Sequence, residues 1–267
     1  MAGMIRFERV TKVFGNGKRV LDDVSYEIEK GEIFTIVGPS GTGKSVSLKH
    51  MIRLLTPTSG RVWVGDDCVS EASGRDLSRI RSRFGYLFQS AALLAWMDVY
   101  DNVALPLREK TKLSEAEIER KVRAALEAVG LGAEGRAMPS DLSGGMQKRA
   151  GLARAIVTEP EIVLYDEPTS GLDPVTSRRI DDLIADLSRR LGITSVVVTH
   201  DLHSALSIST RIAMLGGGKV LSIEPPESFI HSPLPQARAF LDAQYIPRRG
   251  AWENAGREAA HREAKNQ

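Results

Sequence analysis

One eight-residue stretch constrains this chain more than any other part of the sequence: Gly38-Pro39-Ser40-Gly41-Thr42-Gly43-Lys44-Ser45. It matches the phosphate-loop pattern G-x-x-x-x-G-K-[ST] at each specified position. An apolar, β-branched run at 33–37 precedes it and predicts a buried strand, and apolar residues at helical spacing follow it. The alternative is an ordinary glycine-rich turn between a strand and a helix. In the phosphate-binding interpretation the backbone N–H groups surround the phosphates, Lys44 reaches the β- and γ-phosphates, and the Ser45 hydroxyl ligates Mg²⁺.

Composition narrows the class of protein. The 267 residues suffice for one domain with a subdomain, and the net charge of +2 gives no reason to expect a nucleic-acid partner. The single cysteine, Cys68, can form neither an internal disulfide nor a metal site, which favours a reducing, cytosolic compartment. No apolar run approaches the ~20 residues of a transmembrane helix, and the N-terminus lacks the apolar core of a signal peptide. We therefore expect any membrane role to depend on a partner protein.

The order of strands and helices predicts an α/β core. Alternating residues at 5–10 and 24–28 predict an N-terminal antiparallel β subdomain. From residue 162 onward buried strands alternate with helices, which predicts a doubly wound, mostly parallel sheet. The folded domain is expected to span 4–242. The polar tail at 243–267 is either disordered or a surface helix that docks elsewhere.

Two predicted helices interrupt this core without a strand between them. The first covers 114–131, where Ser114 and Glu117 form a capping box at its start. The second covers 143–158. Together they predict a helical subdomain inserted at about 90–160.

Acidic and imidazole side chains follow two of the predicted buried strands. Asp166 and Glu167 come directly after the strand at 162–165, and His200 comes after the strand at 194–199. Ligands bind at the carboxyl ends of strands in open α/β sheets, so these side chains are expected to face the phosphate loop. Asp166 can then hold Mg²⁺, and Glu167 can orient or deprotonate an attacking water. The alternatives are two acids in a surface turn and a structural histidine.

A further motif identifies the family that this chain resembles. Leu142-Ser143-Gly144-Gly145-Met146-Gln147 is similar to the ABC signature, which is far more specific than a phosphate loop. Gln89 matches the glutamine of the Q-loop, and Ser170-Gly171-Leu172-Asp173 matches the D-loop. With Asp166 and Glu167 as the Walker B pair and His200 as the switch histidine, all landmarks occur in the expected order. The chain thus resembles the ATP-binding subunit of ABC transporters over about residues 4–242.

The resemblance implies a fold, two cofactors and a set of site residues. The fold is a P-loop NTPase ABC ATPase fold with a RecA-like, mostly parallel core, an N-terminal antiparallel β subdomain and an inserted helical subdomain. The cofactors are ATP and Mg²⁺, and the assembly is a head-to-tail homodimer in which the signature completes the site of the other subunit. The implied catalytic residues are Glu167, His200, Lys44 and Gln89, and the implied metal ligands are Ser45, Gln89 and Asp166. The implied nucleotide-binding residues are Phe14 as the adenine-stacking aromatic, Gly38, Pro39, Ser40, Gly41, Thr42, Gly43, Lys44, Ser45, Gln89, Ser143, Gly144, Gly145, Asp166 and Asp173.

The sequence departs from the family pattern at two positions. Met146 stands where many members have glutamine, and Val46 stands where threonine or serine is common. The resemblance implies that neither change removes a group that the site needs, because it assigns the γ-phosphate contacts to Ser143 and the glycine backbone and the metal-binding hydroxyl to Ser45. For Phe14 the alternative to adenine stacking is a place in the core of a strand.

Within the family the chain is most similar to the Mla/Mce-type lipid-transport ATPases of bacteria. The similarity lies in the stretches 40–46, 87–93, 99–108 and 142–156. It implies phospholipid or other hydrophobic-substrate transport between membranes through a separate transmembrane permease. It also implies accessory lipid-binding and regulatory subunits, and a location at the cytoplasmic face of the inner membrane.

Three other interpretations of the sequence stay open. They are a non-transport ABC ATPase, an importer ATPase for another substrate, and a nucleotide-gated binding module that does not turn over. The apolar run Leu93-Leu94-Ala95-Trp96-Met97 is the best candidate for the permease contact, with ordinary subdomain core as its alternative.

Overall fold

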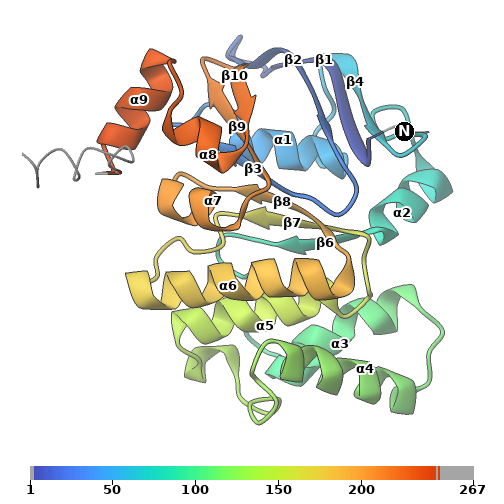
Figure 1. Cartoon of the computed structure of the whole chain (residues 1–267). Helices are drawn as coiled ribbons and strands as arrows, with labels where there is room; N and C mark the ends of the chain where they lie inside the picture. The colour runs from blue at the N-terminus through green and yellow to red at the C-terminus, as the bar shows by residue number, and fades with distance from the viewer. Residues whose placement is uncertain (1–2, 245, 247–267) are drawn as a thin grey trace, which may run out of the picture.

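Two β-sheets form the frame of the molecule (Figure 1). The structure, a computed structural model, describes residues 3–244 and 246. The first sheet is antiparallel, with the strand order β2-β1-β4-β5. Its strands are β1 (Ile5–Val13), β2 (Arg19–Ile28), β4 (Ser59–Val64) and β5 (Asp67–Cys68). The first two strands are longer than predicted because register shifts between them interrupt the alternation of apolar residues.

The second sheet contains the strand that leads into the phosphate loop. Its order is β10-β9-β3-β8-β7-β6, and every pairing is parallel except the hairpin of β9 and β10. This is the mostly parallel core that the sequence predicts. The strands are β3 (Ile33–Val37), β6 (Phe84–Leu87), β7 (Ile162–Asp166), β8 (Thr194–Val198), β9 (Arg211–Gly216) and β10 (Lys219–Glu224).

Both faces of this second sheet are covered. Along β7 the side chains alternate, so that Ile162 and Leu164 join the core that faces the antiparallel sheet, and Val163 and Tyr165 join the core that faces the helices. A strand buried on both faces must be apolar throughout, which explains why the sequence shows it as a continuous apolar run. Figure 1 shows α1 (Lys44–Met51) between the two sheets, and α6 (Pro174–Leu191) and α5 (Gly144–Ile156) below the second sheet.

A helical subdomain lies beyond α5, at the bottom of Figure 1. It adds α3 (Val99–Lys110), α4 (Glu115–Ala128) and the short 3₁₀ helix η1 (Pro139–Asp141) to α5. The capping box of Ser114 and Glu117 is present at the start of α4, as predicted. Helix α3 is not among the helices that the sequence analysis names, because Pro106 interrupts its pattern. It is stabilised by packing on α5 and by Asp98, whose carboxylate accepts a hydrogen bond from the Asp101 N–H.

The remaining helices lie around the sheets. They are α2 (Gly74–Ser82), α7 (Leu202–Ile208), α8 (Pro226–Ile230) and α9 (Pro235–Asp242). A third, small core joins α7, α8 and α9 to β9. Apart from Ala243, Gln244 and Ile246, the predicted tail at 243–267 lies outside the described residues.

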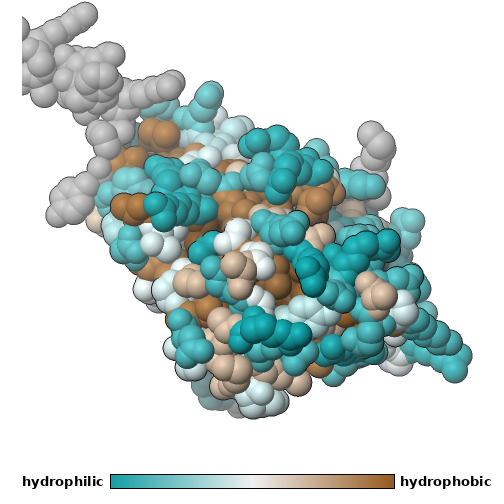
Figure 2. Space-filling view, turned by 90° about the horizontal axis from the view of Figure 1, so that it is seen from below, coloured by the Kyte–Doolittle hydropathy of each residue, from teal (hydrophilic) through white to brown (hydrophobic). Residues whose placement is uncertain are grey.

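The surface below the sheets is chemically mixed. Seen from below in Figure 2, hydrophobic residues gather in several patches that hydrophilic residues separate. Among the exposed large apolar side chains of the described residues, Trp96 has the highest exposure, at 74%. Within residues 3–244, no helix combines the length and the apolar character that crossing a bilayer requires.

Candidate functional site

The phosphate loop joins β3 to α1 in a conformation that only glycine adopts without strain. Gly38, Gly41 and Gly43 have φ angles of +146°, +81° and +103°. A Cβ on Gly38 would overlap the carbonyl oxygen of Leu215 on β9, and one on Gly43 would lie 2.6 Å from Leu21 Cδ2. Gly38 and Gly43 are therefore required by the close approach of neighbouring strands as well as by their φ angles, whereas Gly41 is required by its φ angle alone.

The loop also presents hydrogen-bond donors. Helix α1 begins after Gly43 without a side-chain cap. Within the described part of the chain, the backbone N–H groups of Gly41, Thr42 and Gly43 donate to no protein acceptor. A helix N-terminus with unpaired N–H groups attracts anions, so the loop fits the phosphates of a nucleotide.

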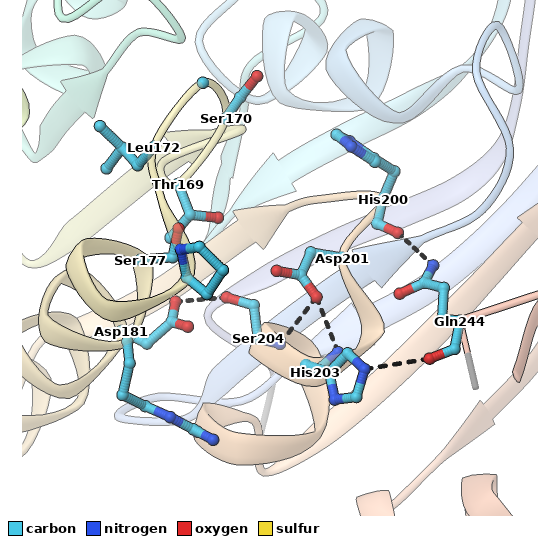
Figure 3. A pocket seen from close by; sticks show the side chains of 13 residues that line it. Thr169, Ser170, Leu172, Ser177, Asp181, His200, Asp201, His203, Ser204 and Gln244 are labelled. Carbon is cyan, nitrogen blue, oxygen red and sulfur yellow. Dashed lines mark hydrogen bonds between the residues drawn. The ribbon is translucent and has the colours of Figure 1, made fainter. Parts of the chain in front are cut away.

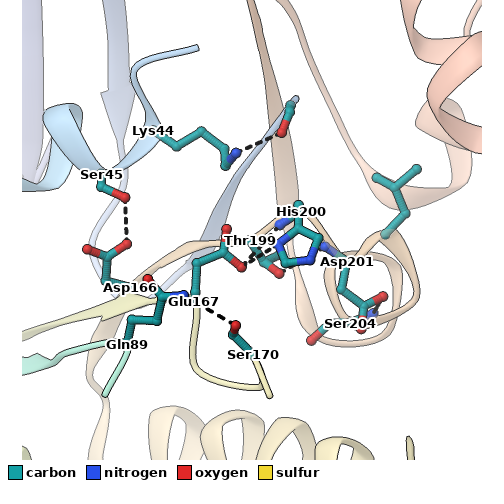
Figure 4. A network of polar contacts seen from close by, with 12 residues as sticks. Lys44, Ser45, Gln89, Asp166, Glu167, Ser170, Thr199, His200, Asp201 and Ser204 are labelled. Atoms are coloured by element: carbon teal, nitrogen blue, oxygen red, sulfur yellow. Dashed lines mark hydrogen bonds and ion pairs between the residues drawn. The ribbon is translucent and has the colours of Figure 1, made fainter. Parts of the chain in front are cut away.

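The Lys44 amine lies over this loop. Its Nζ donates to the carbonyl oxygens of Gly38, at 2.7 Å, and of Pro39, at 3.1 Å (Figure 4). Burial lowers the pKa of Lys44, and the nearby carboxylates of Glu167 and Asp166 oppose that shift. The amine is thus held by the loop and lies in the field of both acids.

Two oxygen-bearing side chains, those of Ser45 and Asp166, meet next to the loop, although 121 residues separate them in sequence. The Ser45 hydroxyl donates to Asp166 Oδ1 at 2.7 Å, and the Tyr86 hydroxyl donates to Asp166 Oδ2 at 3.2 Å. A hydroxyl and a carboxylate side by side are the oxygen donors that Mg²⁺ prefers. Ser45 and Asp166 therefore fit the predicted metal site. Tyr86 was not predicted, since only the pairing of β6 with β7 brings it there.

Glu167 and His200 form a pair at the ends of β7 and β8. His200 Nδ1 lies 2.8 Å from Glu167 Oε2 (Figure 4). The Glu167 side chain is 12% exposed and that of His200 is 59% exposed, so the imidazole covers the carboxylate on its outer side. Glu167 has a φ of +50°, a left-handed conformation that is unusual for a residue with a Cβ. A carboxylate so held can accept a proton from a water molecule in front of the loop.

One cleft of about 430 Å³ gathers residues from the phosphate loop, the Gln89 loop and the ends of β7 and β8. It is lined by Lys44, Ser45, Gln89, Glu167 and His200 together with Ser40, Gly41 and Gly43. Gln89 Nε2 donates to Ser170 Oγ at 3.3 Å. The Gln89 side chain therefore lines the cleft together with Ser45, and its amide bonds Ser170.

The other predicted residues lie outside this cleft. Ser143 caps α5, where its hydroxyl accepts a hydrogen bond from the Met146 N–H at 3.3 Å, and with Gly145 it lines a separate hollow. Asp173 caps α6, accepting from two backbone N–H groups at 3.0 Å. Phe14 follows β1 and is half-buried, with Lys12 Nζ 5.4 Å from its ring centroid. One chain thus brings the loop and the acids together and leaves the signature and Asp173 outside the cleft. Phe14 lies next to the cleft, since its N–H donates to the carbonyl oxygen of Lys18, a lining residue, at 3.0 Å.

A second, larger hollow adjoins the cleft and shares His200 with it (Figure 3). Asp181 of α6 lies at its base, 3% exposed, and accepts a hydrogen bond from the Ser204 hydroxyl. Burial raises the pKa of Asp181 to about 6. On its other side, Gln244 Nε2 donates to the His200 carbonyl oxygen at 2.7 Å. The sequence carries no local signal for either residue, since each contact joins distant segments.

Comparisons with known proteins find a matching family model and several similar sequences. The family model described as ABC transporter matches residues 21–170. The probable ribonucleotide transport ATP-binding protein mkl of Mycobacterium leprae is 42% identical, over 92% of this chain and 71% of that protein. The methionine import ATP-binding protein MetN 1 of Pectobacterium atrosepticum is 44% identical, over 87% and 69%. The intermembrane phospholipid transport system ATP-binding protein MlaF of Escherichia coli is 38% identical, over 91% and 90%.

Solved structures are similar over most of the chain. The dimeric structure of MJ0796, a bacterial ABC transporter cassette, has a TM-score of 0.77 and 34% identity, and covers 84% of this chain and 99% of that one. The same cassette in a dimeric post-hydrolysis state, bound to ADP and Pi, is equally similar.

Proposed function

This chain belongs to the ABC transporter family as an ATP-hydrolysing subunit, and we propose that it drives phospholipid transport between membranes. In this proposal a head-to-tail homodimer of the chain hydrolyses ATP, and a separate permease moves the phospholipid or another hydrophobic substrate. The single observation that carries the catalytic part is the convergence of Lys44, Glu167 and His200 on one cleft.

Each residue of the cleft has a chemical role in the proposal. The loop N–H groups and the Lys44 amine bind and orient the phosphates of ATP, and Ser45 and Asp166 hold Mg²⁺, which supplies charge neutralisation. Glu167 accepts the proton of the attacking water, and His200 holds the Glu167 carboxylate toward the cleft. The Gln89 amide lines the cleft and bonds Ser170, so in this proposal a movement of the loop that follows Gln89 changes the position of this amide in the cleft.

The residues outside the cleft suggest why a second chain is needed. Ser143 and Gly145 line a different hollow from the phosphate loop in the same chain. In the proposed head-to-tail dimer they face the partner's phosphate loop, and the similar MJ0796 cassette has a dimeric structure. Closure then excludes water from both sites.

The surface next to the Gln89 loop supports a permease contact. A hollow of about 320 Å³ lies between this loop and α3, with Phe88 and Leu105 among its lining residues. Within the predicted contact run, Trp96 is 74% exposed, whereas Leu93 packs against the core. The exposed part of the run is therefore the candidate contact, and the stretches similar to lipid-transport ATPases surround it.

A second candidate substrate class is a small polar solute such as an amino acid. The observation in its favour is the 44% identity to a methionine import protein. The two candidates share the same ATPase site, so only the partner and the cargo distinguish them.

The test begins with the purified full-length chain. We expect it to hydrolyse ATP, and we expect a permease and lipid-binding subunits to copurify from the native membrane and raise turnover. Addition of phospholipid vesicles should stimulate the assembled complex, while methionine should not. Stimulation by methionine alone would reject the lipid proposal in favour of the importer.

The catalytic assignment has its own variant. Glu167→Gln keeps the shape of the side chain and removes the base, so turnover should fall about a hundredfold or more while ATP binding persists. Steady-state ATPase rates and equilibrium binding of a fluorescent ATP analogue measure the two quantities. Unchanged turnover would reject Glu167 as the base.

A further inference from the structure

A buried lysine that none of these roles uses lies between two loops of the site. Lys148 is on α5, just after the signature, and is 5% exposed. Its Nζ donates to the carbonyl oxygen of Gln89 and, at 3.1 Å, to the carbonyl oxygen of Glu167. A buried ammonium is costly unless it is hydrogen-bonded, so these two main-chain acceptors determine where the side chain lies.

The contact with Glu167 stabilises a strained residue. A non-glycine residue in the left-handed region costs about 1 kcal/mol or more and persists only where its surroundings hold it. At Glu167, with φ of +50°, the N–H donates to the Val198 carbonyl oxygen at 2.9 Å and the carbonyl accepts from Lys148. The peptide groups on both sides of the Cα are thus held, one by β8 and one by α5. Their positions set the direction in which the carboxylate points.

The same helix holds the loop that follows Gln89. Ala91 and Ala92 have φ angles of +59° and +48°, and Arg154 of α5 donates to both of their carbonyl oxygens at 2.7 Å. Between the two basic residues lies Gly151, where a Cβ would be 2.9 Å from Leu87 Cδ1 and 3.2 Å from the Ala91 Cβ. Helix α5 therefore contacts this loop closely along one face, and Lys148 extends that contact to Glu167.

We propose that Lys148 is a positioning residue that couples the Gln89 loop to the carboxylate of Glu167. One amine bonds both main chains, so the Gln89 carbonyl cannot move away without weakening the hold on the Glu167 peptide. Lys148 acts through the Glu167 main chain and touches no substrate. This inference rests on the proposed role of Glu167 as the base.

Three variants test the positioning role in the full-length chain. Lys148→Met keeps the length of the side chain and removes its donors, and Lys148→Gln keeps an amide donor. The matched control is Arg149→Met, because Arg149 lies on the same helix but donates to the carbonyl oxygens of Val129 and Gly130 at the end of α4. For each variant, kcat and KM for ATP, the Kd of TNP-ATP and the melting temperature are measured.

We expect Lys148→Met to lower kcat at least about tenfold while KM and the Kd of TNP-ATP change less than about threefold. Lys148→Gln should recover part of kcat, and Arg149→Met should keep kcat within about twofold of the parent. Equal kcat in the Lys148→Met and Arg149→Met chains would overturn the proposal. A parallel loss of nucleotide binding and kcat would also overturn it, since the role would then be structural.

A double variant tests the coupling itself. Arg154→Met loosens the loop at Ala91 and Ala92, and should lower kcat in the parent chain but have little further effect when Lys148 is already methionine. Additive effects would reject the coupling. Glu167→Gln distinguishes failure of the proposed base from failure of the proposed coupling. If Glu167→Gln leaves turnover unchanged, the assignment of the base fails. If Glu167→Gln has low turnover but Lys148→Met has normal turnover, only the coupling is rejected.

Discussion

At the scale of single residues, the buried carboxylate of Asp181 makes stability depend on pH. Burial raises its folded-state pKa to about 6, above the ordinary value of 3.8. Between these two values the folded chain binds more protons than the unfolded chain, so this group lowers stability as pH rises. The penalty is largest above pH ~6 and fades toward pH ~4.

Asp181→Asn is therefore expected to stabilise the chain at pH 7.5 by up to ~2 kcal/mol, because the amide carries no charge whose burial costs free energy. The amide can still accept the hydrogen bond of Ser204. At pH 4.5 the advantage should shrink, because the native carboxyl is then protonated. Urea unfolding of both chains at the two pH values measures this difference. An advantage that is independent of pH would contradict the assigned pKa.

At the scale of elements, the phosphate loop depends on how closely β3 approaches β9. Gly38→Ala should lower the free energy of unfolding by about 2 kcal/mol or more, since its Cβ would overlap the Leu215 carbonyl oxygen. Gly41→Ala is the matched control: it has a φ of +81° but no atom within 4 Å of its added Cβ. It should lose only about 1 kcal/mol, from its left-handed conformation. Denaturant unfolding without nucleotide compares the two, and equal losses would show that the contact with β9 is unimportant.

At the scale of the whole molecule, the separation of the signature from the phosphate loop predicts nucleotide-dependent dimerisation. The Glu167→Gln chain should be a monomer without nucleotide and a dimer with ATP and Mg²⁺, measured by light scattering after gel filtration. Adding Ser143→Ala should weaken that dimer at least about tenfold, while Ser140→Ala, at an exposed serine nearby, should not. A dimer that forms without ATP, or that ignores Ser143→Ala, would contradict the head-to-tail arrangement.

The sequence by itself determined most of the strands and helices around the site and the types of side chain that they carry. The strand at 33–37, the glycines of the loop and the capping box of Ser114 and Glu117 are local signals, because each depends on residues only a few positions apart. Helix α3 was not predicted from local signals, because Pro106 interrupts its helical spacing of apolar residues and packing on α5 stabilises it.

Only the tertiary structure decided which residues meet. Ser45 reaches Asp166 because β3, β8 and β7 are consecutive in the parallel sheet. The order of strands in a sheet cannot be predicted from the residues within any one strand. The same order brings Tyr86 to Asp166, and packing of α5 brings the Lys148 amine to the Glu167 carbonyl. Such contacts are stabilised by the burial and pairing of segments that are distant in sequence. The role of a residue like Lys148 therefore cannot be predicted from the residues next to it in the chain.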